Sequence, residues 1–378
     1  MYVGRISLSL IMAGFLITGC SPTSIRNTLW RHTGFANVLP TIAFSHDGKF
    51  LAAGGVFGHD YFEIYDVETL KSIKTFKRKP NELTNCPFLA FSPDGKYLTT
   101  AALDDPMITW DIQTEKEFIN FSRFTSVSEA RYTPDGRIPN LSQLKIVWQV
   151  AYSPDGKILA TAGFKKEIYL FDSITGRELA VLSGHKGDVR CLAFSKSGKL
   201  IATGSSDGMV LLWDGASGKN IARTALHKSP ITSLSFSADG KTLLSTDYHQ
   251  AKFWTLASHD SLEQMVEFGY SPTSNVGILN MTIVVSLAET IDLPESPHVT
   301  KGQYSPDGRY VALKSYNEDK YTSFDIYKIQ ITSLATRETW TIKGTFVDFA
   351  FSPDGEIFAT AGRGVKLWSP ALGMQISR

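Results

Sequence analysis

The 378-residue chain carries 38 Lys and Arg residues against 37 Asp and Glu residues, a formal net charge of +1. Because nucleic acids and anionic membrane surfaces attract proteins with a clear basic excess, this balance argues against a nucleic-acid partner. With 43% hydrophobic and 20% charged residues the chain is expected to be globular, and its three cysteines are too few for disulfides to organise the fold.

Residues 1–19 are predicted to be a signal peptide. Arg5 supplies a short positive region, and the apolar run 6–17 has the length of a signal-peptide core but is too short to span a bilayer as an ordinary helix. The run ends in Ile17-Thr18-Gly19-Cys20, which resembles the bacterial lipobox. That resemblance implies that Cys20 is lipidated, becomes the mature N-terminus and anchors the protein in a membrane.

Residues 20–26 are then the lipid-anchored cysteine and a short polar tether. Ser21 stands where lipoproteins retained at the inner membrane of enterobacteria carry Asp, so the outer membrane is favoured if the source is a Gram-negative bacterium. The predicted location is therefore a cell membrane, with the folded part facing the periplasm or the cell surface. Two alternatives stay open: an ordinary signal peptide with a chance cysteine, and a soluble periplasmic protein.

The rest of the chain contains seven related segments of the form AFSPDGKYLTTA. In each, a β-rich run ends at Ser, a tight turn of the Pro-Asp-Gly type follows, and a second β-rich run completes a hairpin. A third run, such as MVLLWD at 209–214, ends in an aromatic residue, and a weaker fourth run closes the unit. The serines of the seven segments are Ser45, Ser92, Ser153, Ser195, Ser237, Ser305 and Ser352.

These units predict an all-β fold, a β-propeller of four-stranded antiparallel blades. The run 209–214 is apolar on both faces, so each sheet has to be covered on both sides by its neighbours. Long helical patterns, which a TIM barrel needs between strands, are not found. Seven blades are favoured, because the extra turn at 131–140 is too close to the next unit to be a blade. Eight blades stay open, since about 50 residues between Trp254 and Ser305 could be a degenerate blade or a hairpin insertion.

Residues 27–378 resemble the WD40-repeat family. Gly184-His185 and Trp213-Asp214 form its GH…WD signature, and Trp110-Asp111 supplies a second WD pair. The resemblance implies a ring closed by an N-terminal strand in the last blade, for which RNTLWRH at 26–32 is the candidate. The tail MQISR at 374–378 could compete for that edge.

The segment 182–215 contains the residue types of a hydrolytic triad, but its own repeats argue against catalysis. Residues equivalent to Thr203 and Trp213 recur in other units, and His185 has a counterpart at position 227, where no single active site could use them all. The resemblance implies a structural tetrad of His185, a hydroxyl (Thr203 or Ser205), Asp207 and Trp213. This unit alone is expected to carry all four groups, and no catalytic residue is predicted.

Other candidate sites are weak. No metal-ligand or cofactor motif is found, and LHK at 226–228 is interpreted as a polar loop. Cys191 is expected to be a small core residue, with a disulfide to Cys86 as the less favoured alternative.

The first hypothesis for function is a scaffold that binds a protein partner in the cell envelope. In the WD40 family the loops before the first strand and between the second and third strands commonly contact partners. The alternative is a propeller enzyme or small-ligand binder that uses the central channel, and the oligomeric state is left open. Residues chosen by their position in those loops are Asp188, Arg190, Ser206, Phe57, His59 and Asp60.

Overall fold

The structure is a computed structural model, and contacts divide the chain into two units, residues 1–36 and 37–378. All of the described residues belong to the second unit, and none of them forms a helix long and apolar enough to cross a membrane. The described residues are 41–54, 61–77, 88–101, 107–121, 147–163, 166–224, 227–258, 283–292, 297–317, 327–344, 346–362 and 364–376.

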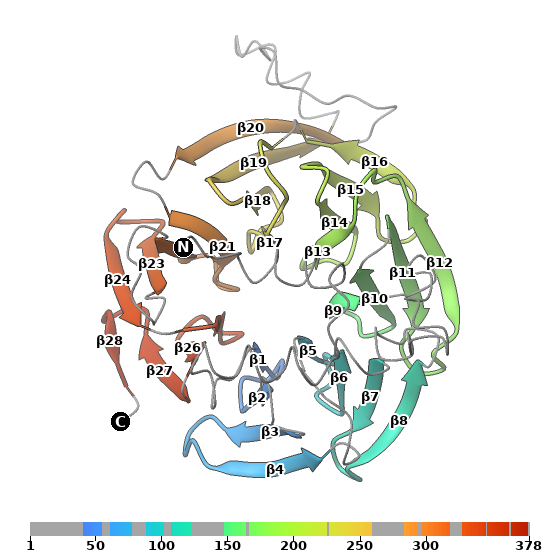
Figure 1. Ribbon diagram of the computed structural model, residues 1–378, viewed down its shortest axis with the longest axis vertical. Helices are drawn as coiled ribbons and strands as arrows, with labels where there is room; N and C mark the ends of the chain where they lie inside the picture. The colour runs from blue at the N-terminus through green and yellow to red at the C-terminus, as the bar shows by residue number, and fades with distance from the viewer. Residues whose placement is uncertain are drawn as a thin grey trace, which may run out of the picture. The chain divides into compact units, whose positions relative to one another are not determined.

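The described residues form seven four-stranded antiparallel sheets arranged as a β-propeller (Figure 1). Each sheet is made of strands consecutive in sequence, so the predicted fold class and the favoured blade count are confirmed. Blade one contains β1 (Thr41–Phe44), β2 (Phe50–Gly54), β3 (Tyr61–Asp66) and β4 (Ser72–Lys77). Blade two contains β5 (Phe88–Phe91), β6 (Tyr97–Ala101), β7 (Met107–Asp111) and β8 (Lys116–Phe121).

The next three blades follow the same order around the ring. Blade three contains β9 (Val147–Tyr152), β10 (Ile158–Gly163), β11 (Glu167–Asp172) and β12 (Glu178–Ser183). Blade four contains β13 (Val189–Phe194), β14 (Leu200–Ser205), β15 (Val210–Asp214) and β16 (Asn220–Arg223). Blade five contains β17 (Ser233–Phe236), β18 (Thr242–Thr246), β19 (Gln250–Ser258) and β20 (Ile283–Asp292).

The last two blades complete the ring. Blade six contains β21 (Pro297–Tyr304), β22 (Tyr310–Asn317), β23 (Tyr327–Ser333) and β24 (Thr339–Gly344). Blade seven contains β25 (Asp348–Phe351), β26 (Phe358–Ala361), β27 (Val365–Ser369) and β28 (Met374–Gln375).

The repeated serine begins a tight turn between the first and second strands. In blade one the Ser45 hydroxyl donates to Asp47 Oδ1 at 2.7 Å and accepts from the Phe50 amide at 2.9 Å. Gly48 closes the turn with φ of 72°, a left-handed conformation that side chains larger than hydrogen disfavour. The same Ser–Asp contact recurs at Ser92, Ser153, Ser237, Ser305 and Ser352.

The hydrophobic core is divided into seven clusters, each formed by two neighbouring blades. Between blades three and four, for example, Ile168 and Leu182 pack with Ile201 and Trp213. A strand that is apolar on both faces therefore contributes to two clusters at once. This packing gives the propeller a rigid frame on which loops are held.

The long segment before blade six supplies the fourth strand of blade five. Its described part, Ile283–Asp292, is β20, which pairs antiparallel with β19 along the whole of that strand. The segment was interpreted as a degenerate eighth blade or a hairpin insertion, and both interpretations are wrong for these residues. The alternation of apolar and polar residues predicts that a segment is a strand, but it does not say with which sheet the strand pairs. The pairing of β20 with blade five was therefore not evident from its sequence.

The outer position of blade seven is occupied by the C-terminal tail. Met374 and Gln375 form β28, which pairs with Trp368 and Ser369 of β27. The tail, the competing candidate, thus lies at this edge, whereas RNTLWRH at 26–32 is outside the described residues, as is the extra turn at 131–140. The first and last blades also share a core cluster that includes Ile42 and Ala359.

A buried charged group joins blades six, seven and one. Lys301 and Lys314 are cross-strand partners in blade six, and both reach blade seven. Lys301 Nζ lies 2.7 Å from Asp348 Oδ1, and the Ile42 amide of blade one donates to Asp348 Oδ2 at 3.2 Å. Lys314 Nζ donates to the Val347 carbonyl. Burial, opposed by Asp348, lowers the pKa of Lys314 to about 8.

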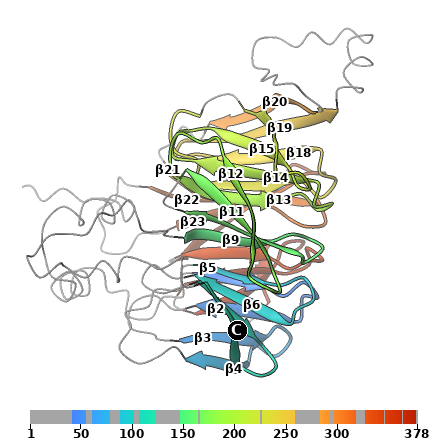
Figure 2. The ribbon, with the colours of Figure 1, turned by 90° about the vertical axis from the view of Figure 1, so that its right-hand side faces the viewer.

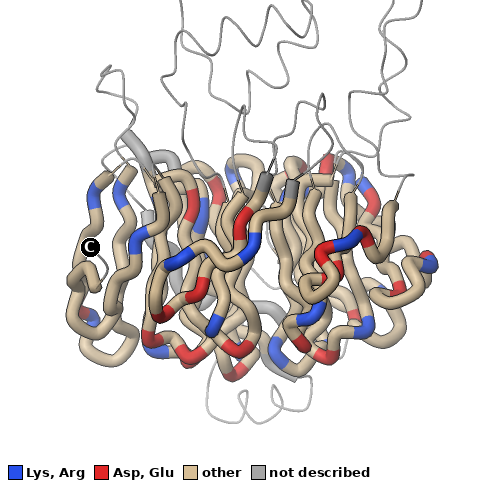
Figure 3. Tube along the Cα trace, turned by 90° about the horizontal axis from the view of Figure 1, so that it is seen from below, with Lys and Arg blue, Asp and Glu red and all other residues tan. Residues whose placement is uncertain are grey.

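The two ends of the ring differ in what they present. We call the end where each first strand begins and each second strand ends the loop face, and the opposite end, with the Ser-Asp-Gly turns, the turn face. Figure 2 shows the ring edge-on, with the strands running across its thickness. On the side of the ring seen in Figure 3, Lys and Arg positions are interspersed with Asp and Glu positions along the chain trace.

Candidate interaction face

Four side chains of blade four form one hydrogen-bonded chain beneath the loop face. Trp213 Nε1 donates to Thr203 Oγ1 at 2.8 Å, and His185 Nε2 lies 2.8 Å from the same hydroxyl. His185 Nδ1 is 3.4 Å from Asp207 Oδ2, which also accepts from the Lys186 amide at 2.7 Å. The hydroxyl of this chain is that of Thr203, while Ser205 instead accepts from the Asp207 amide at 3.2 Å.

The inner members of this chain, His185, Thr203 and Trp213, are buried, while Asp207 is partly exposed. The His185 side chain has 0% exposure, and Thr203 is 0% exposed. Burial lowers the pKa of His185 below its usual range despite the neighbouring Asp207, so the imidazole is neutral at pH 7. Because a dissolved substrate has no access to these atoms, they act as a brace between the loop and the two middle strands.

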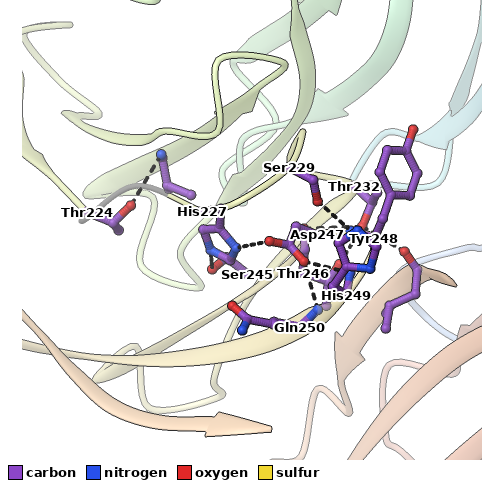
Figure 4. A network of polar contacts seen from close by, with 12 residues as sticks. Thr224, His227, Ser229, Thr232, Ser245, Thr246, Asp247, Tyr248, His249 and Gln250 are labelled. Carbon is purple, nitrogen blue, oxygen red and sulfur yellow. Dashed lines mark hydrogen bonds and ion pairs between the residues drawn. The ribbon is translucent and has the colours of Figure 1, made fainter. Parts of the chain in front are cut away.

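Blade five contains a second complete brace, of which Figure 4 shows His227, Ser245 and Asp247. Trp254 Nε1 donates to Ser245 Oγ at 2.7 Å, and His227 Nε2 is also 2.7 Å from that oxygen. His227 Nδ1 lies 3.1 Å from Asp247 Oδ2. The expectation that blade four alone carries all four groups is therefore wrong. His227 lies in a polar loop, as the sequence indicates, but its side chain is buried.

The second brace is missed when each residue of blade four is compared with the residue 42 positions later, because the hydroxyl and the aspartate are spaced differently in the two blades. Asp207 follows Thr203 by four positions, whereas Asp247 follows Ser245 by two, so a shift of 42 residues places His249 opposite Asp207. The loop between the second and third strands is shorter in blade five. A search that let this loop vary in length would have found Asp247.

In two other blades the described residues include the inner half of the brace. Trp110 Nε1 donates to Thr100 Oγ1, and Trp368 Nε1 donates to Thr360 Oγ1, each at 3.0 Å. A buried indole N–H needs an acceptor, and the hydroxyl of the second strand supplies it in all four blades. Asp104, which the sequence places in blade two, lies outside the described residues.

Acid is expected to destabilise the propeller through its two buried histidines and Asp247. Burial lowers the pKa of His185 and of His227 below their usual 6.5. Burial opposes ionisation of Asp247, but hydrogen bonds from His227 and the following amides outweigh it and lower its pKa from 3.8 to about 2. Between the folded and unfolded pKa values the unfolded chain binds more protons, so the free energy of unfolding falls as the pH falls.

The loss should therefore begin near pH 6.5 through the histidines, and the contribution of Asp247 should disappear between pH 3.8 and about 2. Urea midpoints measured from pH 7.5 to 4 would show it. A His185→Gln/His227→Gln double variant should give a flatter profile than the parent over this range. A parent midpoint that stays constant down to pH 4 would contradict the expectation.

At the loop face, Arg190 of blade four contacts residues of both neighbouring blades. Its Nη1 donates to the Tyr248 hydroxyl of blade five at 3.0 Å. Its Cζ lies over the indole of Trp148 of blade three, 5.0 Å from the ring centroid. All three side chains are half-buried. We call Trp148, Arg190 and Tyr248 the arginine cluster.

Two members of the arginine cluster, Trp148 and Arg190, lie at β-bulges. Gln149 and Val147 pair with adjacent residues of β10, which leaves Trp148 as an extra residue in β9. In β13 the register likewise shifts between Val189 and Cys191, which leaves Arg190 unpaired in the ladder. Such bulges turn a side chain out of the regular alternation and recur beside binding sites. Each bulge lies five positions before the repeated serine, a signal that would have identified Trp148 beside Arg190 from the sequence.

Two more of the residues chosen from the sequence lie beside the arginine cluster. The Ser206 amide donates to the Asp188 carbonyl at 2.8 Å, which holds the two loops of blade four together. Burial raises the pKa of Asp188, while Arg190 and Lys166 oppose that shift. The structure therefore brings Asp188, Arg190 and Ser206 to one place. Phe57, His59 and Asp60, as well as Cys20 and Cys86, lie outside the described residues.

No group of three or more His, Cys, Asp or Glu side chains that could hold a metal ion occurs in the described part of the chain. Cys191 is a free, buried thiol whose pKa is raised to about 12 by burial.

Three segments of this ring match a known protein family. Residues 141–172, 176–214 and 218–255 match the family "WD domain, G-beta repeat". These segments are WD40 repeats. The second and third WD40 repeats each begin with the outer strand of one blade and end in the third strand of the next, so they cover blades three to five, which carry both complete braces and the arginine cluster.

Individual proteins share parts of this pattern. The chain is 28% identical over 144 residues to "Periodic tryptophan protein 2 homolog" of Schizosaccharomyces pombe, a match that covers 38% of this chain and 16% of that protein. Among solved structures, the β-propeller domain of Cps50 (Swd1) from Myceliophteria thermophila superposes with a TM-score of 0.66 and 18% identity, covering 88% of this chain and 96% of that one. At this identity, the likeness shows a shared fold.

Proposed function

We propose that this WD40 propeller is a scaffold that binds a protein partner at the loop face of blades three to five. WD40 propellers generally bind proteins, and the observation that carries the proposal here is the arginine cluster. Trp, Tyr and Arg are the residues most enriched among those that dominate binding energy at protein interfaces. Here one of each is half-buried on adjacent blades, joined by the contacts of Arg190.

The frame beneath this face supports the proposal. The braces of blades four and five fix the loops that carry Ser206 and Tyr248 through buried hydrogen bonds. A surface fixed before binding loses little conformational entropy when a partner docks. Catalysis by the brace residues would require substrate access to the hydroxyls of Thr203 and Ser245, both of which are 0% exposed.

Site-specific crosslinking tests the face directly. A photoactivatable residue placed at Ser206 on the loop face is expected to capture a reproducible partner in the native cells. The same residue at Lys196, exposed on the turn face of the same blade, serves as the matched control. Capture from position 196 alone, or from neither position, would count against the loop face as the partner site.

We further propose that the scaffold is held at a membrane of a bacterial cell envelope by lipid on Cys20, with the outer membrane favoured in a Gram-negative source. The support is the apolar run 6–17 and the lipobox-like residues that end in Cys20. The relatives named above are eukaryotic, so the location depends on residues 1–26 alone. Mass spectrometry of the mature N-terminus should find an acylated Cys20, and Cys20→Ser should leave the membrane fraction. An unprocessed N-terminus would overturn this part of the proposal.

A further inference from the structure

Two N–H groups of the arginine cluster are buried without an acceptor. Trp148 Nε1 and Arg190 Nε are shielded from solvent, and neither has a hydrogen-bond partner among the described residues. A buried donor left unpaired costs about 1–3 kcal/mol, and such groups are rare in native proteins unless they serve a purpose. The two donors come from neighbouring blades, and the guanidinium of Arg190 lies over the indole of Trp148, with its Cζ 5.0 Å from the ring centroid.

The charge of Arg190 is also unbalanced. Its hydrogen bond goes to the neutral phenol of Tyr248, and no carboxylate of the described residues lies within ion-pair distance. Asp188 is near enough to interact electrostatically with Arg190, and Lys166 with Asp188, but among the described residues no hydrogen bond or ion pair joins either side chain to the guanidinium. A half-buried cation in this setting favours an incoming anion, because a charge-assisted hydrogen bond is about twice as strong as a neutral one.

We propose that the arginine cluster binds a carboxylate presented by an acidic peptide segment of the partner. This inference rests on the proposed function and names the chemistry of its ligand. A carboxylate has two oxygens, so it accepts from Arg190 Nε and Trp148 Nε1 together, while Arg190 Nη1 stays on Tyr248. A peptide amide offers one uncharged oxygen and satisfies only one donor. Because both nitrogens are shielded in the free protein, binding opens the contact between Arg190 and Trp148.

The opening of that contact gives a direct measurement. The full-length protein, labelled with ¹⁵N in its tryptophans, is titrated with three blocked peptides while the Trp148 indole signal, assigned through Trp148→Phe, is followed. Ac-Gly-Glu-Gly-NH₂ carries a side-chain carboxylate, Ac-Gly-Gly-Gly-OH a terminal one, and Ac-Gly-Gln-Gly-NH₂ none. The first two distinguish the source of the carboxylate. A saturable shift with either, at least about tenfold weaker with the Gln peptide, is expected.

Variants separate the site from general charge attraction. Arg190→Gln should abolish the saturable shift, and Arg223→Gln, which removes an exposed cation from the outer strand of the same blade, should leave it unchanged. Asp188→Asn should strengthen binding, because it removes a like charge beside the ligand. This variant retains every member of the cluster, so it tests the proposal even if Arg190→Gln fails to fold.

The proposal is overturned if no peptide gives a saturable Trp148 shift, if the Glu and Gln peptides bind equally, or if Arg223→Gln weakens binding as much as Arg190→Gln. Its failure is distinguishable from failure of the scaffold. Capture from Ser206 without a peptide response would retain the partner face and reject the carboxylate. Absence of capture would reject the face itself.

Discussion

Replacing Asp348 with Ala should lower the free energy of unfolding by about 3–5 kcal/mol, because it leaves the buried Lys314 and the half-buried Lys301 without a counter-ion. Lys301 loses its partner at 2.7 Å, and the Ile42 amide loses its acceptor at 3.2 Å. Burial lowers the pKa of Lys314 to about 8, and the substitution removes the Asp348 carboxylate, which raises that pKa. The damage falls where blades six, seven and one meet, so the whole ring should be affected.

Urea or thermal unfolding of purified Asp348→Ala measures this loss. Glu68→Ala, which removes an exposed carboxylate from the turn between β3 and β4, is the matched control and should change stability by less than about 0.5 kcal/mol. Adding Lys301→Met to Asp348→Ala should recover part of the loss, since one uncompensated cation disappears. Equal stability of Asp348→Ala and the Glu68 control would show that this ion pair does not support ring closure.

Ser245→Ala should cost about 2–5 kcal/mol, although it removes a single oxygen. That oxygen accepts from Trp254 Nε1 and lies 2.7 Å from His227 Nε2. Since His227 Nδ1 faces the carboxylate of Asp247, Nδ1 carries the proton and Nε2 accepts from the serine. The substitution therefore strands one buried donor and one buried acceptor, each at about 1–3 kcal/mol.

Two variants test this interpretation of the brace. Ser245→Thr should remain close to the parent, because Thr203 fills the same role in blade four. Ser183→Ala, at an exposed hydroxyl, should be close to neutral. Chemical unfolding monitored by tryptophan fluorescence compares them. A loss from Ser245→Ala below about 0.5 kcal/mol would mean that the brace contributes little beyond packing.

The blades could be predicted from the sequence because each one repeats the same local chemistry. A serine that bonds the aspartate two positions on, followed by a left-handed glycine, marks the first hairpin of six blades, and blade four keeps the serine and glycine with Ser197 in place of the aspartate. Strands that are apolar on both faces then require covering sheets on either side. Fold class and blade number follow from these two local facts.

Features set by contacts between distant residues were not predictable in the same way. β20 joins β19 across residues 259–282, and nothing in its own pattern names that partner. Asp247 was missed because its loop is shorter, and Trp148 and Tyr248 matter only because Arg190 reaches both of their blades. The arginine cluster forms only when blades three, four and five lie side by side, and each of these blades contributes one of its three side chains.

The consecutive order of strands within every sheet has a genetic consequence. The serines of blades three, four and five are each 42 residues apart, so one uninterrupted stretch of coding sequence supplies a complete four-stranded sheet. Duplicating or deleting such a stretch changes the number of sheets without leaving another sheet short of a strand. Blades three to five, whose serines are equally spaced and whose segments match one family model, are where we expect the traces of the most recent duplications in this gene.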